Sequence, residues 1–209
     1  MIIAFFGIFV YGLLAALPGS VLPTLERNQY LPNDSAVATF LLINAIGAVL
    51  AYLVSGPIID RFGKKFALFF GATLVITSMA SFALTVTNVL AAAALWLIFS
   101  CSLVLGLGAN AIVAAAHALV VDVAAAWRNA ALNLLDICFG LGLASLPLVV
   151  QRMQQRGGLG MIFWSLAGAA FVLLVLVTAA RFPTPMLSES FPIISPAPLA
   201  AQREMCVLD

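Results

Sequence analysis

Six long apolar runs, separated by short polar stretches, constrain this sequence more than any other feature. We place them at about 2–22, 37–59, 66–87, 97–121, 130–150 and 160–180. Each holds about twenty residues, the length that a helix needs to cross a hydrocarbon core of about 30 Å. Lipid offers backbone N–H and C=O groups no hydrogen-bond partner, so each run must satisfy its own. The sequence therefore predicts an all-α, polytopic membrane protein with six transmembrane helices.

The composition agrees with lipid as the main surroundings of the chain. Of the 209 residues, 64% are hydrophobic and 8% are charged, whereas soluble domains carry about 25% charged residues. A net charge of +1 without a long basic run gives nucleic-acid binding no electrostatic support. The three cysteines form neither a disulfide framework nor a metal-binding spacing. We expect no cofactor, no metal and no nucleic-acid partner.

The composition changes after the sixth run. Residues 182–209 contain repeated prolines, which prevent a regular helix across most of this segment. The prolines are Pro183, Pro185, Pro192, Pro196 and Pro198. The sequence predicts a bundle over residues 1–181 and a disordered C-terminal tail over 182–209.

Basic residues beside the runs predict the orientation in the membrane. If both termini are cytoplasmic, the inner flanks hold Arg61, Lys64, Lys65, Arg128 and Arg181. The outer flanks then hold Arg27, Arg152 and Arg156. Lys and Arg are enriched in cytoplasmic loops, so this bias favours cytoplasmic termini. We expect a multi-pass protein of the cell membrane (a bacterial inner membrane or a plasma membrane).

The loop between the second and third runs reads Gly56-Pro-Ile-Ile-Asp-Arg-Phe-Gly-Lys-Lys and ends at Lys65. It carries four charged side chains, and Gly63 permits a tight turn. Anchoring at the inner membrane surface would account for the lysines and Arg61, but it does not account for Asp60.

This loop resembles the signature loop between helices two and three of the major facilitator superfamily, Gly-x-x-x-Asp-Arg-x-Gly-Arg/Lys-Arg/Lys. Every specified position matches: Gly56, Asp60, Arg61, Gly63, Lys64 and Lys65. The resemblance implies that these residues link the two halves of a transporter on the inner face. There they help control the change between outward-facing and inward-facing states.

Two shorter stretches extend the resemblance. Gly106-Leu-Gly108 resembles a Gly-x-Gly stretch of the fourth helix. Residues 129–135 and 139–142 resemble the fifth helix of sugar-type members such as fucose permease relatives. The superfamily fold has two six-helix halves that hold the solute between them. The resemblance implies that residues 1–181 correspond to the first half.

Two positions depart from the family patterns. Ser102 stands where many members have an arginine four residues before the first Gly of the Gly-x-Gly stretch. Proton-coupled members often use that arginine, so Ser102 weakens the case for this form of coupling. Leu146 stands where antiporters have the second glycine of a Gly-x-x-x-Gly-Pro pattern, which weakens an antiporter interpretation.

Asp136 in the fifth run and His117 in the fourth are candidates for coupling. A carboxylate inside an apolar run costs a few kcal/mol unless it is paired, protonated or hydrated. Both residues lie at a similar depth from the predicted inner boundary. They could form a His–Asp pair whose protonation couples to solute movement. Alternatively, His117 bonds only backbone or water, and Asp136 faces an aqueous cleft.

Three amides are candidates for solute binding. Asn133 lies one turn before Asp136, and Gly140 lies one turn after it, so the three share a helical face. Asn110 and Asn44 lie inside the fourth and second runs. Amides offer both donors and acceptors, which suits hydroxyl-rich solutes. The alternative is that they form hydrogen bonds between helices.

The sequence therefore predicts half of a secondary transporter that moves a small polar solute by alternating access, with a sugar as one candidate. The other half of the solute-binding site would come from a second six-helix half or a second copy of the chain. The alternative is a truncated fragment without transport activity, at most a membrane scaffold that associates with another half. An enzyme has little support, because no nucleophile–base pair or metal-spaced cluster is present.

Overall fold

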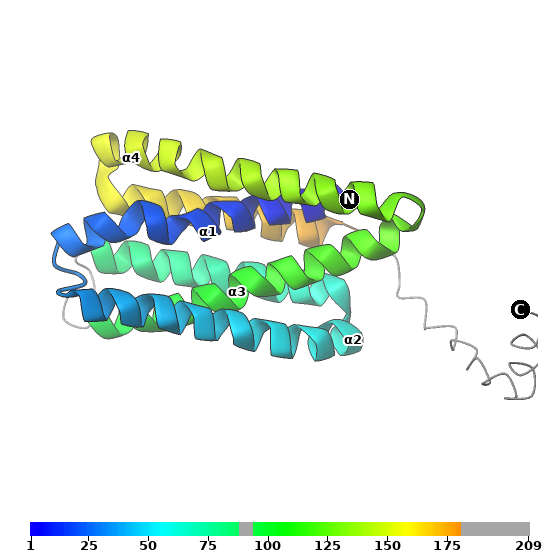
Figure 1. Ribbon diagram of the computed structural model, residues 1–209, viewed down its shortest axis with the longest axis horizontal. Coiled ribbons are helices and arrows are strands. Elements are labelled where there is room, and N and C mark those ends of the chain that lie inside the picture. Colours follow the sequence, from blue (N-terminus) through cyan, green and yellow to red (C-terminus); the bar gives the residue numbers. More distant parts are fainter. Residues whose placement is uncertain (88–93, 181–209) are drawn as a thin grey trace, which may run out of the picture.

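The computed structural model describes residues 1–87 and 94–180, and the predicted tail over 182–209 lies outside this range. The described residues form helices and turns, without a strand among them. The helices are α1 (Ile2–Arg27), α2 (Asp34–Val86), α3 (Ala94–Val123), the short 3-10 helix η2 (Ala125–Trp127) and α4 (Arg128–Ala179). Figure 1 shows them side by side in one elongated bundle.

Two glycines divide the longest helices into arms. Gly63 has φ 83° and ψ 164°, and Gly158 has φ 69° and ψ −169°. Glycine reaches such angles because it has no Cβ. We call residues 34–62 and 64–86 the first and second arms of α2, and residues 128–157 and 159–179 the first and second arms of α4. Figure 1 shows that each second arm returns alongside the bundle.

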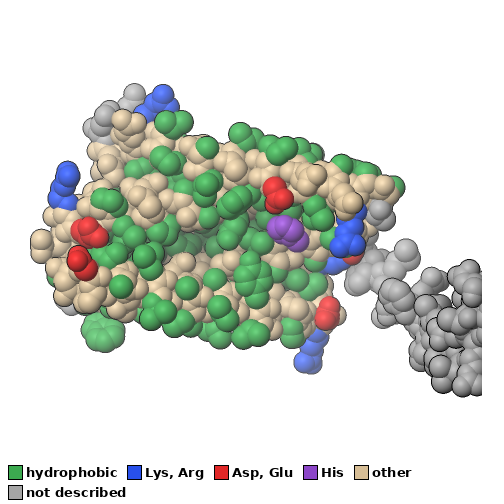
Figure 2. All heavy atoms as spheres, viewed as in Figure 1, with side chains coloured by type: hydrophobic (Ala, Val, Ile, Leu, Met, Phe, Trp, Pro, Cys, Tyr) green, Lys and Arg blue, Asp and Glu red, His purple; other side chains and the backbone are tan. Residues whose placement is uncertain are grey.

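The membrane character predicted from the apolar runs is confirmed. Among the described residues, five helices are long and apolar enough to cross a membrane. They are Ile2–Arg27, Asp34–Val86, Leu95–Val123, Arg128–Gln154 and Gly158–Ala179. Figure 2 shows charged side chains near the two ends of the bundle and hydrophobic side chains over much of the belt between them. The all-helical class is confirmed, and the count of six crossings stays a prediction.

The predicted loop from Gly56 to Lys65 is wrong in its extent. The helix continues through Gly56 and Pro57, and only Gly63 departs from helical geometry. A proline removes one backbone hydrogen bond, which transmembrane helices tolerate. Similarly, α1 does not end near residue 22 but continues past Pro23 to Arg27.

Close approaches at glycine fix how the helices cross. A Cβ added at Gly12 of α1 would overlap the carbonyl oxygen of Phe139 in the first arm of α4. A Cβ added at Gly106 of α3 would overlap the carbonyl oxygen of Asn44 in the first arm of α2. Small residues of this kind bring membrane helices into backbone contact. These two crossings set the rotation of the first arms, and therefore which of their side chains face outward.

Candidate functional site

Lys64 joins the reversal of α2 to the end of α3. Its ammonium forms an ion pair with the carboxylate of Asp122, which lies one residue before the end of α3. Partial burial lowers the pKa of Lys64 from its usual range. The pair holds the reversal of α2 against the end of α3.

Lys65 joins the same reversal to the end of α4. Its ammonium donates hydrogen bonds to the carbonyl oxygens of Thr178, at 3.2 Å, and Ala180, at 2.8 Å. The last carbonyls of a helix have no partner within the helix and carry its partial negative charge. Lys65 therefore caps the second arm of α4.

The remaining side chains of the signature stretch point away from this half. Asp60 and Arg61 are exposed, and Asp60 has no hydrogen bond or ion pair within residues 1–87 and 94–180. The Arg61 guanidinium lies 5.6 Å from the centre of the Phe62 ring. Gly56 is exposed, with no atom near the position of a Cβ. Thus Lys64 and Lys65 bind within the half, while Gly56, Asp60 and Arg61 leave an open surface. The gating role of the six residues stays a prediction.

Asp136 and Asn133 lie on an exposed face of the first arm of α4, together with Gly140. Asp136 is eight residues from the start of α4, or about 12 Å along the helix axis. Neither Asp136 nor Asn133 forms a side-chain hydrogen bond or ion pair with another described residue. An unpartnered carboxylate at this depth is unsuited to a lipid-facing surface.

His117 bonds its own helix rather than Asp136. Its Nδ1 lies 2.9 Å from the carbonyl oxygen of Val113. A carbonyl only accepts hydrogen bonds, so Nδ1 carries the proton, and Nε2 of the neutral ring is an acceptor. In the part of the chain that is described, no hydrogen bond or ion pair joins His117 to Asp136. The histidine (purple) and an acidic side chain (red) both appear within the apolar belt of Figure 2.

Asn44 and Asn110 are used for contacts between and within helices. The Asn44 amide donates to the carbonyl oxygen of Ser102 at 3.0 Å, and the Ser102 hydroxyl donates back to Phe40 at 2.9 Å. Asn110 is buried and donates to the carbonyl oxygen of Gly106 at 2.8 Å. The Asn44 bond joins two helices, whereas the Asn110 bond to Gly106 lies within α3, and a role of either amide in solute binding stays a prediction.

Among the described residues, no three His, Cys, Asp or Glu side chains gather closely enough to hold a metal ion. A small crevice between α2 and α3 is lined by Ala51, Ser55, Ala67 and Leu107, together with other apolar side chains. Its apolar lining does not suit a polar solute.

The family described as Major Facilitator Superfamily matches residues 4–203. The chain belongs to the major facilitator superfamily. This confirms the resemblance carried by the stretch from Gly56 to Lys65. No curated protein sequence matches the chain.

The crystal structure of a D-xylose–proton symporter has a similar fold. The TM-score is 0.79 at 17% sequence identity, and the match covers 100% of this chain and 52% of the symporter chain. The chain therefore spans about half the length of that transporter. At this identity the likeness shows the fold alone, and the fold is that of a multi-pass membrane protein of the superfamily.

Tyr11 and Tyr52 were not among the candidate site residues predicted from the sequence. Tyr11 of α1 stacks on Phe139 of α4, with ring centres 5.5 Å apart, and its hydroxyl lies 3.5 Å from the Asn110 side-chain oxygen. Tyr52, in the first arm of α2, is 54% exposed. Their position inside apolar runs could have identified them, because a tyrosine hydroxyl needs a polar partner there.

Proposed function

We propose that this chain is one six-helix half of a secondary transporter that moves a small polar solute across the cell membrane by alternating access. The arms of α2 and α4, together with α1 and α3, give six segments. Each arm holds more than twenty residues, about 30 Å or more of helix. Figure 1 shows the N-terminus at the same end of the bundle as the reversal of α2. The lysines at this reversal favour the cytoplasm for that end.

Asp136 is the observation that carries the proposal. It is an exposed carboxylate without a partner in the described half, and it lies in an apolar arm. Contact with lipid would cost a few kcal/mol, so this face requires water or another protein surface. The first arm of α2 also exposes large side chains, among them Leu42, Val49 and Tyr52. We assign these two first arms to the wall of a solute cleft.

A second six-helix half, or a second copy of this chain, supplies the opposite wall in this proposal. The two halves of superfamily transporters are related by an axis along the membrane normal, so both halves have the same orientation. The similar symporter chain is about twice as long as the part that this chain covers. Gly56, Asp60 and Arg61 are placed to meet the opposite wall at the inner end.

A sugar is the first class of solute to test. Asn133 offers a donor and an acceptor, Asp136 offers acceptors, and Tyr52 offers a hydroxyl on the facing arm. The similar structure is titled a D-xylose–proton symporter. Protons are therefore the first coupling ion to test, with Asp136 and the Nε2 atom of His117 as acceptors. Position 102 holds Ser102 instead of the arginine that proton-coupled members often use, which weakens the case for that form of coupling; Ser102 is buried and donates to the carbonyl oxygen of Phe40.

Sugar uptake by the reconstituted chain tests this proposal. The purified 209-residue chain is placed in vesicles with an inward proton gradient, and its oligomeric state is measured in the same preparation. We expect saturable uptake that depends on the gradient and that is lost in Asp136→Asn. Glu26→Gln makes the same chemical change at an exposed position at the outer end of α1 and should keep wild-type uptake. Equal uptake by wild type and Asp136→Asn would refute the assignment of Asp136.

Association without transport is the second candidate, because the chain spans only 52% of the similar transporter. In this case the chain is a membrane scaffold that pairs with another half. A folded monomer that takes up no solute would favour the scaffold. Saturable uptake by a dimer would favour transport by two copies.

A further inference from the structure

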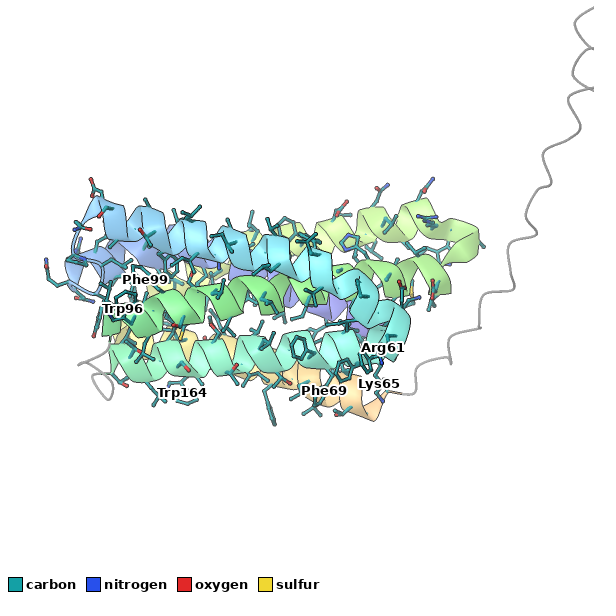
Figure 3. The ribbon with its side chains drawn as sticks, turned by 90° about the horizontal axis from the view of Figure 1, so that it is seen from below. Arg61, Lys65, Phe69, Trp96, Phe99 and Trp164 are labelled. Atoms are coloured by element: carbon teal, nitrogen blue, oxygen red, sulfur yellow. The ribbon has the colours of Figure 1, made fainter. Side chains whose placement is uncertain are left out.

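The first arms of α2 and α4 lie along the two long sides of one face of the bundle, with α1 and α3 between them (Figure 1). The second arms lie elsewhere: Figure 3 shows Phe69 and Trp164 along the edge that they form, on the opposite side from the first arm of α2. Copies of one membrane protein insert in one orientation, so two copies close over this face by a two-fold rotation about the membrane normal. That rotation places the first arm of α2 against the first arm of α4 of the second copy.

The two arms then run antiparallel, with their ends at one level. The first arm of α2 runs toward the reversal at Gly63, whereas the first arm of α4 starts at this end of the bundle with Arg128. The ion pair between Lys64 and Asp122 holds the reversal beside the end of α3, shortly before α4 begins. Residues that lie equally far from Asp60 and from Arg128 of the second copy are therefore opposite each other.

The polar residues at these opposite positions are complementary. Asp60 meets Arg128, and both are exposed and form no ion pair with another described residue. Tyr52 lies eight residues before Asp60, and Asp136 lies eight residues after Arg128. Both are exposed, so a hydroxyl donor meets the carboxylate that has no partner within the described half.

Small residues follow at the next turn on each arm. Ala48 lies one turn beyond Tyr52, and Gly140 lies one turn beyond Asp136. No atom lies within 4 Å of a Cβ position at Gly140. Small residues let membrane helices approach closely, so the polar pairs can come within hydrogen-bond distance.

We propose that the opposite wall is a second copy of this chain, held by two identical contacts between the first arm of α2 of one copy and the first arm of α4 of the other. Each contact joins Asp60 to Arg128 and Tyr52 to Asp136, with Arg61 at its edge. The contacts close the inner end of the cleft, and their release opens it to water. This inference rests on the proposed function for the presence of an opposite wall, but it does not depend on transport activity.

Charge reversal tests the contact in a way that requires a second copy. Asp60→Arg brings two cations together at each contact, and Arg128→Asp brings two carboxylates together. Each variant alone should therefore dimerise about tenfold more weakly than the wild type. A mixed dimer of the two variants has the reversed pair at one contact and the native pair at the other. We expect mixed dimers to form in preference to uniform ones.

Two differently tagged forms are expressed together, so that both insert in one orientation, and native mass spectrometry of the purified protein counts mixed and uniform dimers. The control combines Glu26→Arg with Arg27→Asp, two reversals at the exposed outer end of α1, which is outside the contact. Its dimers should form in the statistical proportion. The same proportion for Asp60→Arg with Arg128→Asp, or a wild type that forms no dimer, would overturn the proposal.

Two glycines of α4 separate loss of the contact from loss of the fold. Gly140→Leu fills the space between the arms, whereas Gly168→Leu makes the same change in the second arm; neither Cβ position has an atom within 4 Å. Gly140→Leu should weaken the dimer and Gly168→Leu should not, and equal dimerisation of the two variants would contradict the contact. A dimer with these properties that takes up no solute would support this inference and refute the proposed transport, whereas uptake by a monomer would do the reverse.

Discussion

The crossing of α3 with the first arm of α2 should be highly sensitive to one methyl group. Gly106→Ala places a Cβ where the carbonyl oxygen of Asn44 already lies. The obstacle is backbone on both helices, so rotation of a side chain cannot relieve it. The helices must move apart at this point. The nearby hydrogen bonds between Asn44, Ser102 and Phe40 must then lengthen.

The expected loss of stability follows from these contacts. Overpacking costs about 1–3 kcal/mol, and each of the two interhelical hydrogen bonds contributes about 0.6 kcal/mol. The higher helix propensity of alanine relative to glycine offsets about 0.5–1 kcal/mol of this loss. The net decrease in the free energy of unfolding is therefore about 1–4 kcal/mol.

Gly168→Ala is the matched control for this prediction. Gly168 lies in the second arm of α4, and no atom lies within 4 Å of its Cβ position. Alanine there should be neutral or slightly stabilising, by up to about 1 kcal/mol. Unfolding of the purified protein in a graded detergent series, followed by circular dichroism, measures both variants. If Gly106→Ala unfolded at the same midpoint as Gly168→Ala, the helices would not be in backbone contact.

Two further substitutions test the reversal of α2. Gly63→Ala should lower the free energy of unfolding by about 1–3 kcal/mol, because a residue with a Cβ is strained at φ 83° and ψ 164°. Gly56→Ala is the control, because it lies at an open helical position and should not lower this free energy. Equal unfolding midpoints for the two variants would contradict the strain at Gly63. A double-mutant cycle on Lys64 and Asp122 should give a coupling of about 0.2–1 kcal/mol that shrinks with salt, because the Asp122 side chain is 60% exposed. A coupling above about 2 kcal/mol would contradict this solvent-screened interpretation.

The helical class and the reversal at Gly63 could be predicted from the sequence because they depend on local properties. Run length and apolar composition determine membrane helices, and a glycine between two runs permits the turn. The extent of the loop could not be predicted in the same way. Gly56 and Pro57 normally interrupt helices, yet a transmembrane helix can absorb a single missing hydrogen bond.

The roles of the polar candidates were harder to predict because they depend on helix rotation. In a soluble helix, polar residues mark the outer face, but in a membrane helix the lipid face and the packed face are both apolar. The sequence therefore could not separate Asn44, which bonds Ser102, from Asn133, which is exposed. The rotation is set by backbone contacts such as that between Gly12 and Phe139, which join residues far apart in the chain.

The charged residues of the signature stretch fall into two groups, one that contacts other helices and one that is exposed. Lys64 and Lys65 bind the ends of α3 and α4, so three helices are held together at one end of the bundle. Asp60 and Arg61, from the same turn, are exposed and form no ion pair within the described half. Alternating access in this fold is largely a rocking of one half against the other. A half that rocks as one body needs internal contacts at its inner end and open charges on the surface that meets its partner. We propose that this stretch supplies both, the internal contacts through Lys64 and Lys65 and the open charges through Asp60 and Arg61.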